Sequence, residues 1–500
     1  MNTERNRKII YWLLPVMGAA FCLWYVKNAT CDVVYSDYIR LVNSYLPDVY
    51  DPSKFFVPDV LTRIPINYLS RIVNVELFGF SITFERVLGV AGLGLAGLVF
   101  GIYCKNRKIG SLWFALLMAV MFSLNKWEML TNGSGWAHFF AFACFYYHEL
   151  VLDRVWSGQE KKHDRVKLLV LPWLIILGTA GPYCAIYAVT LIMSYAFCMV
   201  WDRYGQRDGA GLPREAGLPY GTVLQRETAP AGRVAVSARP AWDTRYLAYI
   251  VCVLVPLLLY ILSNSFAVEE HAGATGRSMM EILSDNPSFP VRFMLKSFAG
   301  ILVGGEELQE LMKQGVMSSR MCYLLGAFVV MGYLLALWMN LRLRIYEKTI
   351  LPMMLLAGGG LNHVIIFISR YIFESESYAL SSRYALQFQV GILGMVITFA
   401  LAWNRKAGKQ TLRRILVAVF CLAILAGNGY TTYHEIKKAP NREESFENKA
   451  RVAIGIPDMT QEELESEEAD LADLYEYRKG VDKIQDAFRI LKDNRLNVFH

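Results

Sequence analysis

The sequence lacks the short motifs by which many enzymes hold a metal ion, a nucleotide or a nucleophilic serine. It shows no zinc-ligand spacing, no glycine-rich nucleotide loop and no nucleophile elbow. No internal repeat is visible, and residues 9–26 end without the small residues that mark a secretory cleavage site. These absences argue against the common soluble catalytic sites, and we expect residues 9–26 to be retained as a membrane anchor.

Long apolar runs dominate the sequence instead. Of its 500 residues 54% are hydrophobic, and the mean hydropathy is +0.29, whereas soluble domains are about 45–50% apolar. A helix that crosses a bilayer needs ~20 mostly apolar residues. The sequence therefore predicts an all-α polytopic membrane protein with about eleven transmembrane helices. The predicted spans are 9–27, 82–103, 110–125, 134–151, two spans within 167–201 separated by Gly181-Pro182, 246–264, 322–340, 349–368, 384–403 and 415–431.

Charge in the connecting loops alternates along the chain. One set is basic, and residues 405–414 hold five basic residues and no acid; the others are 5–8, 105–108, 161–165 and 342–348. The alternate set, which includes 28–81 and 265–320, is acidic or mixed. Because Lys and Arg favour cytoplasmic loops, we expect a cytoplasmic N-terminus, an extracytoplasmic C-terminus and a place in the cell membrane. The net charge of +7 is spread over these loops, so we expect no nucleic-acid partner.

The composition divides the chain into a transmembrane domain, 1–431, and an acidic extracytoplasmic tail, 432–500. Within the first, 28–81 is a large outer loop, 202–245 a flexible cytoplasmic loop, and 265–320 an outer loop with an interfacial or re-entrant helix near 290–304. The tail holds sixteen Asp and Glu and eleven Lys and Arg. Thr460 and Glu463 form a capping-box pattern, and an apolar stripe follows at helical spacing. We expect a helical tail that docks on the outer loops.

The first outer loop carries carboxylates close to the end of the first span. Asp37 could accept a proton from an acceptor hydroxyl, as a general base does, with Asp32 as the second candidate. Arg40 and Glu76 lie in the same loop and are candidate substrate-binding residues. The alternative for Asp37 is a structural role as the cap of a helix over 38–45, because Asp is a common N-cap residue.

A second group of polar residues surrounds the approach to a late span. Arg370 and Arg383 are placed on the outer side against the usual bias, and Tyr384 follows directly. A guanidinium forms forked contacts with phosphate, so a lipid-linked phosphate is a suitable ligand. The alternative is that the arginines only anchor the ends of spans. Inside the predicted spans, His138 and His363 are functional candidates because ionisable groups are rare there. The alternative is that they are hydrogen-bonded packing residues.

The layout resembles the GT-C superfamily of membrane glycosyltransferases, in a bacterial branch. The resemblance rests on Ser36-Asp37-Tyr38 in the first outer loop, on Ser369-Arg370 and Ser382-Arg383-Tyr384 before a late span, and on the ending 491–499. It implies a catalytic Asp37, a lipid-phosphate-linked sugar as donor, a glycan or other envelope acceptor, contact with membrane lipids and no organic cofactor. The scattered outer carboxylates leave a divalent cation open, although no ligand spacing requires a metal.

Three other functions remain open from the sequence. A polysaccharide polymerase or ligase acts on lipid-linked glycans and would use arginine-bearing outer loops equally well. A transporter or flippase usually has related halves and broken helices, and no matching halves are found here. A non-catalytic membrane protein of the same fold is the fourth reading. The favoured hypothesis is transfer of a sugar from a polyprenyl-phosphate donor on the outer face.

Overall fold

The computed structural model describes residues 2–46, 48–52, 65–204, 243–264, 275–403, 405 and 410–500. The predicted flexible loop 202–245 lies outside these residues except at its two ends. Throughout the described residues the chain is built from helices and turns, and none of these residues forms a β-strand. The protein is therefore all-α, as the sequence predicts.

A helix occupies each of the eleven segments that the sequence marks as apolar. They are α1 (Asn2–Ala29), α4 (Ile82–Asn106), α5 (Ser111–Met121), α7 (Trp136–Trp156), α8 (Asp164–Gly178), α9 (Cys184–Tyr204), α10 (Thr244–Asn264), α14 (Ser319–Arg342), α15 (Leu351–Arg370), α16 (Ala385–Trp403) and α17 (Gln410–Ala453). Among the described residues, eight helices are long and apolar enough to cross a membrane, so the chain has the make-up of a multi-pass membrane protein. The other three are α5 and α8, which are short, and α7, whose second half carries charged residues. Eleven crossings therefore remain a prediction.

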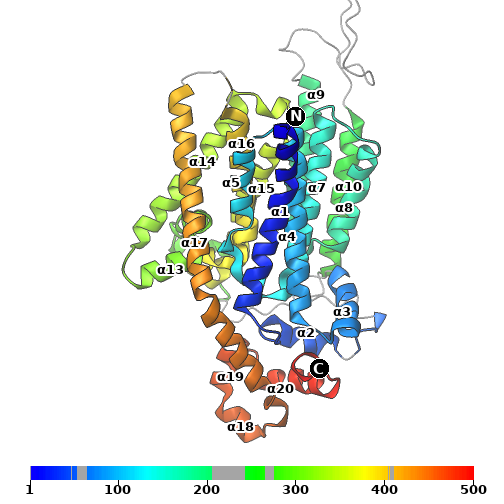
Figure 1. Ribbon diagram of the computed structural model, residues 1–500, viewed down its shortest axis with the longest axis vertical. Coiled ribbons are helices and arrows are strands. Elements are labelled where there is room, and N and C mark those ends of the chain that lie inside the picture. The colour runs from blue at the N-terminus through cyan, green and yellow to red at the C-terminus, as the bar shows by residue number, and fades with distance from the viewer. Residues whose placement is uncertain are drawn as a thin grey trace, which may run out of the picture.

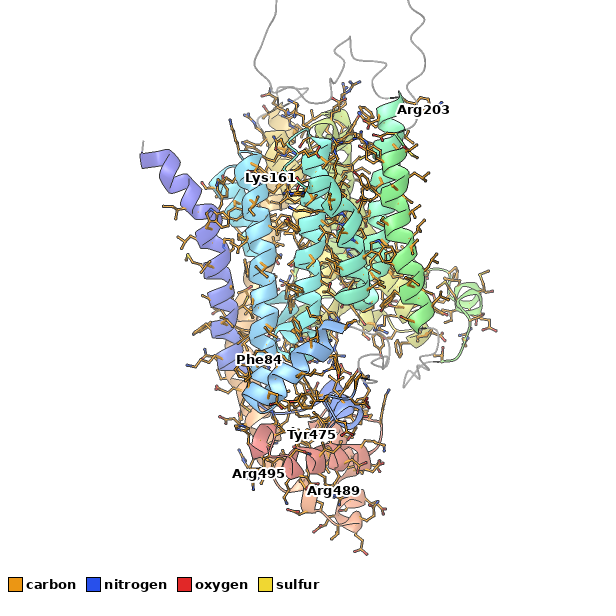
Figure 2. All side chains as sticks on the ribbon, turned by 90° about the vertical axis from the view of Figure 1, so that its right-hand side faces the viewer. Phe84, Lys161, Arg203, Tyr475, Arg489 and Arg495 are labelled. Atoms are coloured by element: carbon orange, nitrogen blue, oxygen red, sulfur yellow. The ribbon has the colours of Figure 1, made fainter. Side chains whose placement is uncertain are left out.

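The helices form one elongated bundle whose two ends differ. The N-terminus and the C-terminus lie at opposite ends (Figure 1). Lys161 and Arg203 lie at one end, and Tyr475, Arg489 and Arg495 lie at the other (Figure 2). We call the latter the tail end. The basic loops between the helices lie at the opposite end.

Polar contacts tie those basic loops together. Arg107 pairs with Asp153 at 2.5 Å, and Asp153 also accepts a hydrogen bond of 2.7 Å from the Thr349 hydroxyl. The Trp156 indole N–H donates to the Tyr346 carbonyl over 2.6 Å. Loops that are far apart in the sequence thus meet at one end of the bundle, as the alternation of charge predicts.

Short helices cover the tail end. They are α2 (Asp37–Tyr45), α3 (Pro65–Phe78), α6 (Trp127–Thr131), α11 (Met279–Asp285), α12 (Phe289–Leu302) and α13 (Gly305–Lys313). The segment predicted as an interfacial or re-entrant helix is α12, and it packs tightly between α14 and α17. A Cβ atom on Gly326 of α14 would lie 1.8 Å from the Leu295 carbonyl oxygen, and one on Gly427 of α17 would lie 2.2 Å from that of Leu302. The second half of α12, from Ser297 to Leu302, is thus buried in the bundle, and its Ser297 hydroxyl lies 2.8 Å from Nδ1 of His363.

The tail is helical and rests on the first outer loop. Helix α17 has 44 residues, about 65 Å at 1.5 Å per residue, so it extends well beyond a bilayer core. Helices α18 (Gln461–Ser466), α19 (Glu468–Leu474) and α20 (Val481–Asp493) follow it, and α20 lies beside α2 (Figure 1). The capping box of Thr460 and Glu463 is present, as predicted. The predicted stripe forms a shared core with residues 33–49; its fully buried members include Leu471, Tyr475, Ile484, Phe488 and Leu491.

Candidate functional site

The tail positions the start of α2. The Ser36 backbone N–H donates to the Tyr475 carbonyl over 2.7 Å, and Ser36 takes a φ of +52°. This turn makes Asp37 the first helical residue, while Ser36 occupies the cap position without a side-chain hydrogen bond. Asp37 therefore does not cap α2. Its side chain is 45% exposed and lies 3.9 Å from Arg40, so the carboxylate is available to a ligand.

Asp32, the second predicted catalytic carboxylate, is occupied by structural contacts. It accepts hydrogen bonds of 2.5 Å from the Ser81 hydroxyl and 2.7 Å from the Ile82 N–H, which is the first N–H of α4. The Asn497 side-chain amide donates to the same carboxylate over 3.2 Å. A carboxylate at a helix N-terminus satisfies otherwise unpaired N–H groups. Asp32 thus joins the first loop, the start of α4 and the C-terminal residues.

Arg383 is joined to two glutamates from other parts of the chain. Its Nε donates to Glu128 of α6, and the neighbouring Ser382 hydroxyl donates to Glu128 over 2.9 Å and to Glu306 over 3.2 Å. The two Nη groups of Arg383 make no hydrogen bond to another described residue. A guanidinium fixed through Nε in this way still presents a fork of donors to an anion.

Arg370 has no carboxylate partner among the described residues. Its Nε donates to the Tyr384 hydroxyl, and one Nη reaches the Ser369 carbonyl at 3.4 Å. Beside this pair, the Tyr183 hydroxyl lies 3.5 Å from Nδ1 of His138. A guanidinium without a carboxylate is a candidate for binding an anionic ligand.

These predicted residues gather in one region at the tail end. The Asp37 carboxylate acts electrostatically on both Arg383 and His138. Tyr183, which contacts His138, is acted on in turn by Arg370 and Tyr384. We call the set Asp37, Glu128, His138, Arg370, Arg383 and Tyr384 the Asp37 cluster. It assembles side chains from α2, α6, α7, α15 and the turn before α16.

The remaining two predicted residues differ in position. Arg40 pairs with Asp37 and so adjoins the cluster. Glu76 is exposed on α3, where its carboxylate accepts a hydrogen bond from the Tyr50 hydroxyl. No described contact connects Glu76 to the cluster.

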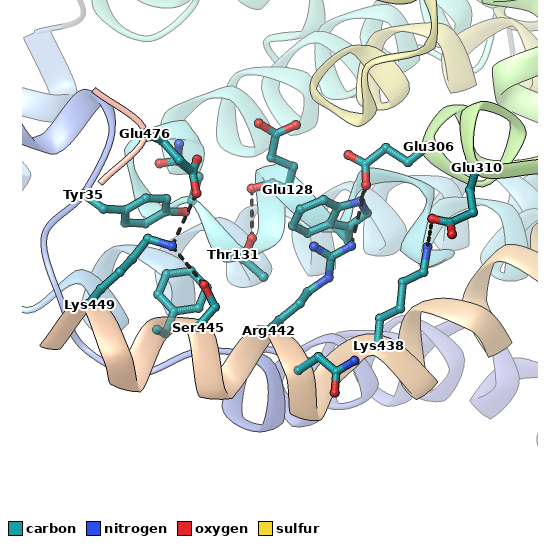
Figure 3. A pocket seen from close by; sticks show the side chains of 14 residues that line it. Tyr35, Glu128, Thr131, Glu306, Glu310, Lys438, Arg442, Ser445, Lys449 and Glu476 are labelled. Atoms are coloured by element: carbon teal, nitrogen blue, oxygen red, sulfur yellow. Dashed lines mark hydrogen bonds and ion pairs between the residues drawn. The ribbon is translucent and has the colours of Figure 1, made fainter. Parts of the chain in front are cut away.

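A cavity of about 530 Å³ opens next to the cluster (Figure 3). One wall is the extension of α17, from which Lys438, Arg442 and Lys449 point into the space, and the facing wall carries Glu306 and Glu310 (Figure 3). The rest of the lining comes from Tyr35, Trp127, Glu128, Thr131, Asn132, Asn441, Ser445, Phe446 and Glu476. Because Glu128 also holds Arg383, the cavity and the cluster share a residue.

Charges in the cavity are mutually compensated. The Arg442 guanidinium lies 3.2 Å from the centre of the Trp127 ring, 2.9 Å from Glu435 and 3.6 Å from Glu306. The Trp127 indole N–H donates to Glu306 over 2.9 Å. Burial raises the pKa of Glu306 to about 7, and the negative charges of Glu128 and Glu435 act in the same direction, against the stabilising charge of Arg442.

Among the described residues, no three His, Cys, Asp or Glu side chains are grouped as they would be around a metal ion. The chemistry available here consists of an accessible carboxylate, two guanidinium groups with uncommitted donors, and an aromatic and amide lining. This combination can bind an anion and position a hydroxyl compound beside it.

Sequence reasoning missed Glu128, Glu306, Trp127 and Arg442. A signal for two of them was present, because Trp127 and Glu128 stand in the short connection between two predicted spans on the same side as Asp37. Arg442 gave no such signal, because it is one of many charged residues in a tail that is expected to dock on the outer loops.

Comparisons of the chain with protein-family models, with curated proteins and with solved structures find no match.

Proposed function

We propose that this chain is a membrane glycosyltransferase of the GT-C type, which transfers a sugar from a polyprenyl-phosphate donor to a cell-envelope acceptor. In this proposal all eleven bundle helices cross the membrane, and the tail end faces outward. The charge alternation supports the direction, since the basic loops lie together at the opposite end.

The observation that carries the proposal is that the charge of Asp37 acts on Arg383, whose neighbour Tyr384 is hydrogen-bonded to Arg370. Asp37 is more than three hundred positions from either arginine in the sequence. Arginines that only anchored span ends would need no carboxylate from the first loop beside them. A base near cationic groups that can hold a phosphate is an arrangement that suits glycosyl transfer from a lipid phosphate.

The residues divide the reaction between them. The uncommitted donors of Arg370 and Arg383 hold the donor phosphate and stabilise the negative charge that develops on it. The acceptor hydroxyl loses its proton to the Asp37 carboxylate while its oxygen bonds to the anomeric carbon. The bond from that carbon to the phosphate oxygen breaks, and the polyprenyl phosphate leaves with the bonding electrons.

The adjacent cavity is suited to the acceptor. Trp127, Asn441 and Asn132 offer an aromatic surface and amide groups, which suit the apolar faces and hydroxyl groups of a sugar. Glu128 belongs both to the cavity lining and to the Asp37 cluster. An acceptor in the cavity would therefore approach a donor held at Arg383.

The test is a transfer assay with purified protein in lipid vesicles that contain a polyprenyl-phosphate hexose labelled in the sugar. Asp37→Asn is compared with the wild type and with Asp48→Asn, which changes an exposed carboxylate of the same loop. We expect transfer of the label to added glycan to fall by about a hundredfold or more in Asp37→Asn, as for loss of a general base, and to persist in Asp48→Asn. Equal transfer by both variants would remove Asp37 from the mechanism.

A further inference from the structure

Helix α3 has its polarity reversed relative to a helix of a soluble domain. Its buried side chains include Asn67, Arg71 and Asn74, which are 7%, 5% and 0% exposed. Apolar side chains dominate the outside instead, where Leu69, Val73, Leu77 and Phe78 are 55%, 43%, 72% and 46% exposed. The one acidic side chain on this face is Glu76, whose carboxylate accepts a hydrogen bond from the Tyr50 hydroxyl. Leu69, Val73 and Leu77 follow one another at a spacing of four and therefore form one stripe. In water such a stripe would face the core.

The buried face of α3 is polar because it has specific polar partners. The Asn74 side chain donates to the Ser81 carbonyl over 2.9 Å and accepts from the Ser81 N–H over 2.8 Å. The Arg71 guanidinium lies 4.3 Å from the centre of the Tyr45 ring and acts electrostatically on Glu85. These contacts fix the rotation of α3, so the outward direction of the apolar stripe is built into the fold.

Next to the stripe, at the end of α3, apolar side chains continue onto the surface of the bundle. The Phe78 ring stacks on Phe84 at the start of α4, with centres 4.3 Å apart, and Val87 is exposed one turn further along α4. Helix α3 also packs against α8, whose Leu174 is 61% exposed. Helix α4 is one of the eight helices able to cross a membrane, so this surface is the one that acyl chains would cover.

The corner between α3 and α4 is held by the C-terminal residues. The Asn497 backbone N–H donates to the Gly79 carbonyl over 2.7 Å, and its side chain donates to the Phe80 carbonyl over 3.1 Å. Gly79 has a φ of +59°, and a Cβ atom there would lie 2.1 Å from the His500 ring. Contacts with the C-terminal residues and with α4 thus fix the position of α3 along the bundle.

We propose that α3 is a membrane-interface helix, which lies at the level of the lipid headgroups with its apolar stripe in the acyl region. The partner is phospholipid, and the binding mode is that of an amphipathic helix lying on a bilayer. In this position residues 65–78 lie against the membrane surface. The inference is independent of the proposed function, because it concerns only the lipid contact of α3.

The test uses a photo-crosslinking residue, p-benzoylphenylalanine, in the full-length protein. The variants are Leu77→p-benzoylphenylalanine and Val73→p-benzoylphenylalanine, reconstituted in vesicles of phosphatidylethanolamine and phosphatidylglycerol. Matched controls carry the same residue at Ile454, which is 59% exposed on the tail side of α17, and at Leu334, which is 60% exposed in α14. After illumination, intact-protein mass spectrometry measures the fraction that has gained the mass of one phospholipid.

Positions 73 and 77 are expected to give lipid adducts several times more abundant than position 454, and comparable with those at 334. Since all four side chains are exposed, the substitutions leave the core untouched. A yield at 73 and 77 as low as at 454 overturns the inference. So does crosslinking of these positions to a second copy of the chain, or to another segment of the same chain, in place of lipid.

Discussion

Replacing Phe488 by alanine probes the shared core of the tail and the first outer loop. Phe488 is fully buried, and its ring centre lies 5.1 Å from that of Tyr475 in an edge-on arrangement. A buried Phe→Ala change costs about 3–5 kcal/mol, and the ring pair accounts for about 0.5–1.5 kcal/mol of that. Since about 1.4 kcal/mol corresponds to a factor of ten, opening of this unit should become about a hundredfold or more frequent.

Hydrogen–deuterium exchange measured by mass spectrometry reports this opening. In Phe488→Ala we expect faster exchange in α20 and also in residues 33–46, because Tyr475 holds the Ser36 N–H. Ile454→Ala removes an exposed side chain from the same part of the chain and should leave both regions unchanged. If Phe488→Ala accelerates exchange in α20 alone, the loop and the tail do not form one cooperative unit.

Three further changes test other parts of the account. Glu306→Gln should flatten the pH dependence of thermal unfolding. A carboxyl whose pKa is raised from 4.5 to about 7 stabilises the fold below pH ~4.5 and loses that contribution as the pH rises through ~7. An unaltered pH profile in the variant would contradict the raised pKa of Glu306. Gly326→Ala forces a Cβ to within 1.8 Å of the Leu295 carbonyl, whereas Gly360→Ala meets nothing within 4 Å; the unfolding temperature should fall only in the first variant. Asp32→Ala removes the contacts at the start of α4 and should cost about 0.5–2 kcal/mol of stability. Loss of sugar transfer without any loss of stability would instead assign Asp32 a catalytic role.

Periodicity and charge predicted much of the fold, because both are local properties of the chain. The break at Gly181-Pro182 is present, since α8 ends at Gly178 and α9 begins at Cys184. The run 110–125 is longer than its helix, which ends at Met121. The Lys126 ammonium donates to the Met121 and Ser123 carbonyls, each over 2.9 Å, and so satisfies the end of α5 in a way that apolar periodicity does not reveal.

The candidate site was predictable only in part, because contacts between distant residues are not a local property of the chain. The placement of Asp37, Arg370 and Arg383 at one end follows from counting spans, which requires no knowledge of packing. The pairing of Arg383 with Glu128 joins positions 255 apart and depends on how α6 meets the turn before α16. Asp32 and Asn497 are 465 positions apart, so the sequence alone does not distinguish a carboxylate that caps the start of α4 from a catalytic one.

The central claim is that Arg370 and Arg383 form a phosphate site beside Asp37. Binding of a polyprenyl phosphate to the purified protein in detergent, followed by native mass spectrometry, tests this most directly. We expect Arg383→Gln to lose binding of the polyprenyl phosphate, whereas Asp37→Asn and Arg320→Gln retain it. Arg320 is an exposed arginine at the same end of the bundle. Equal binding by Arg383→Gln and Arg320→Gln would contradict the account.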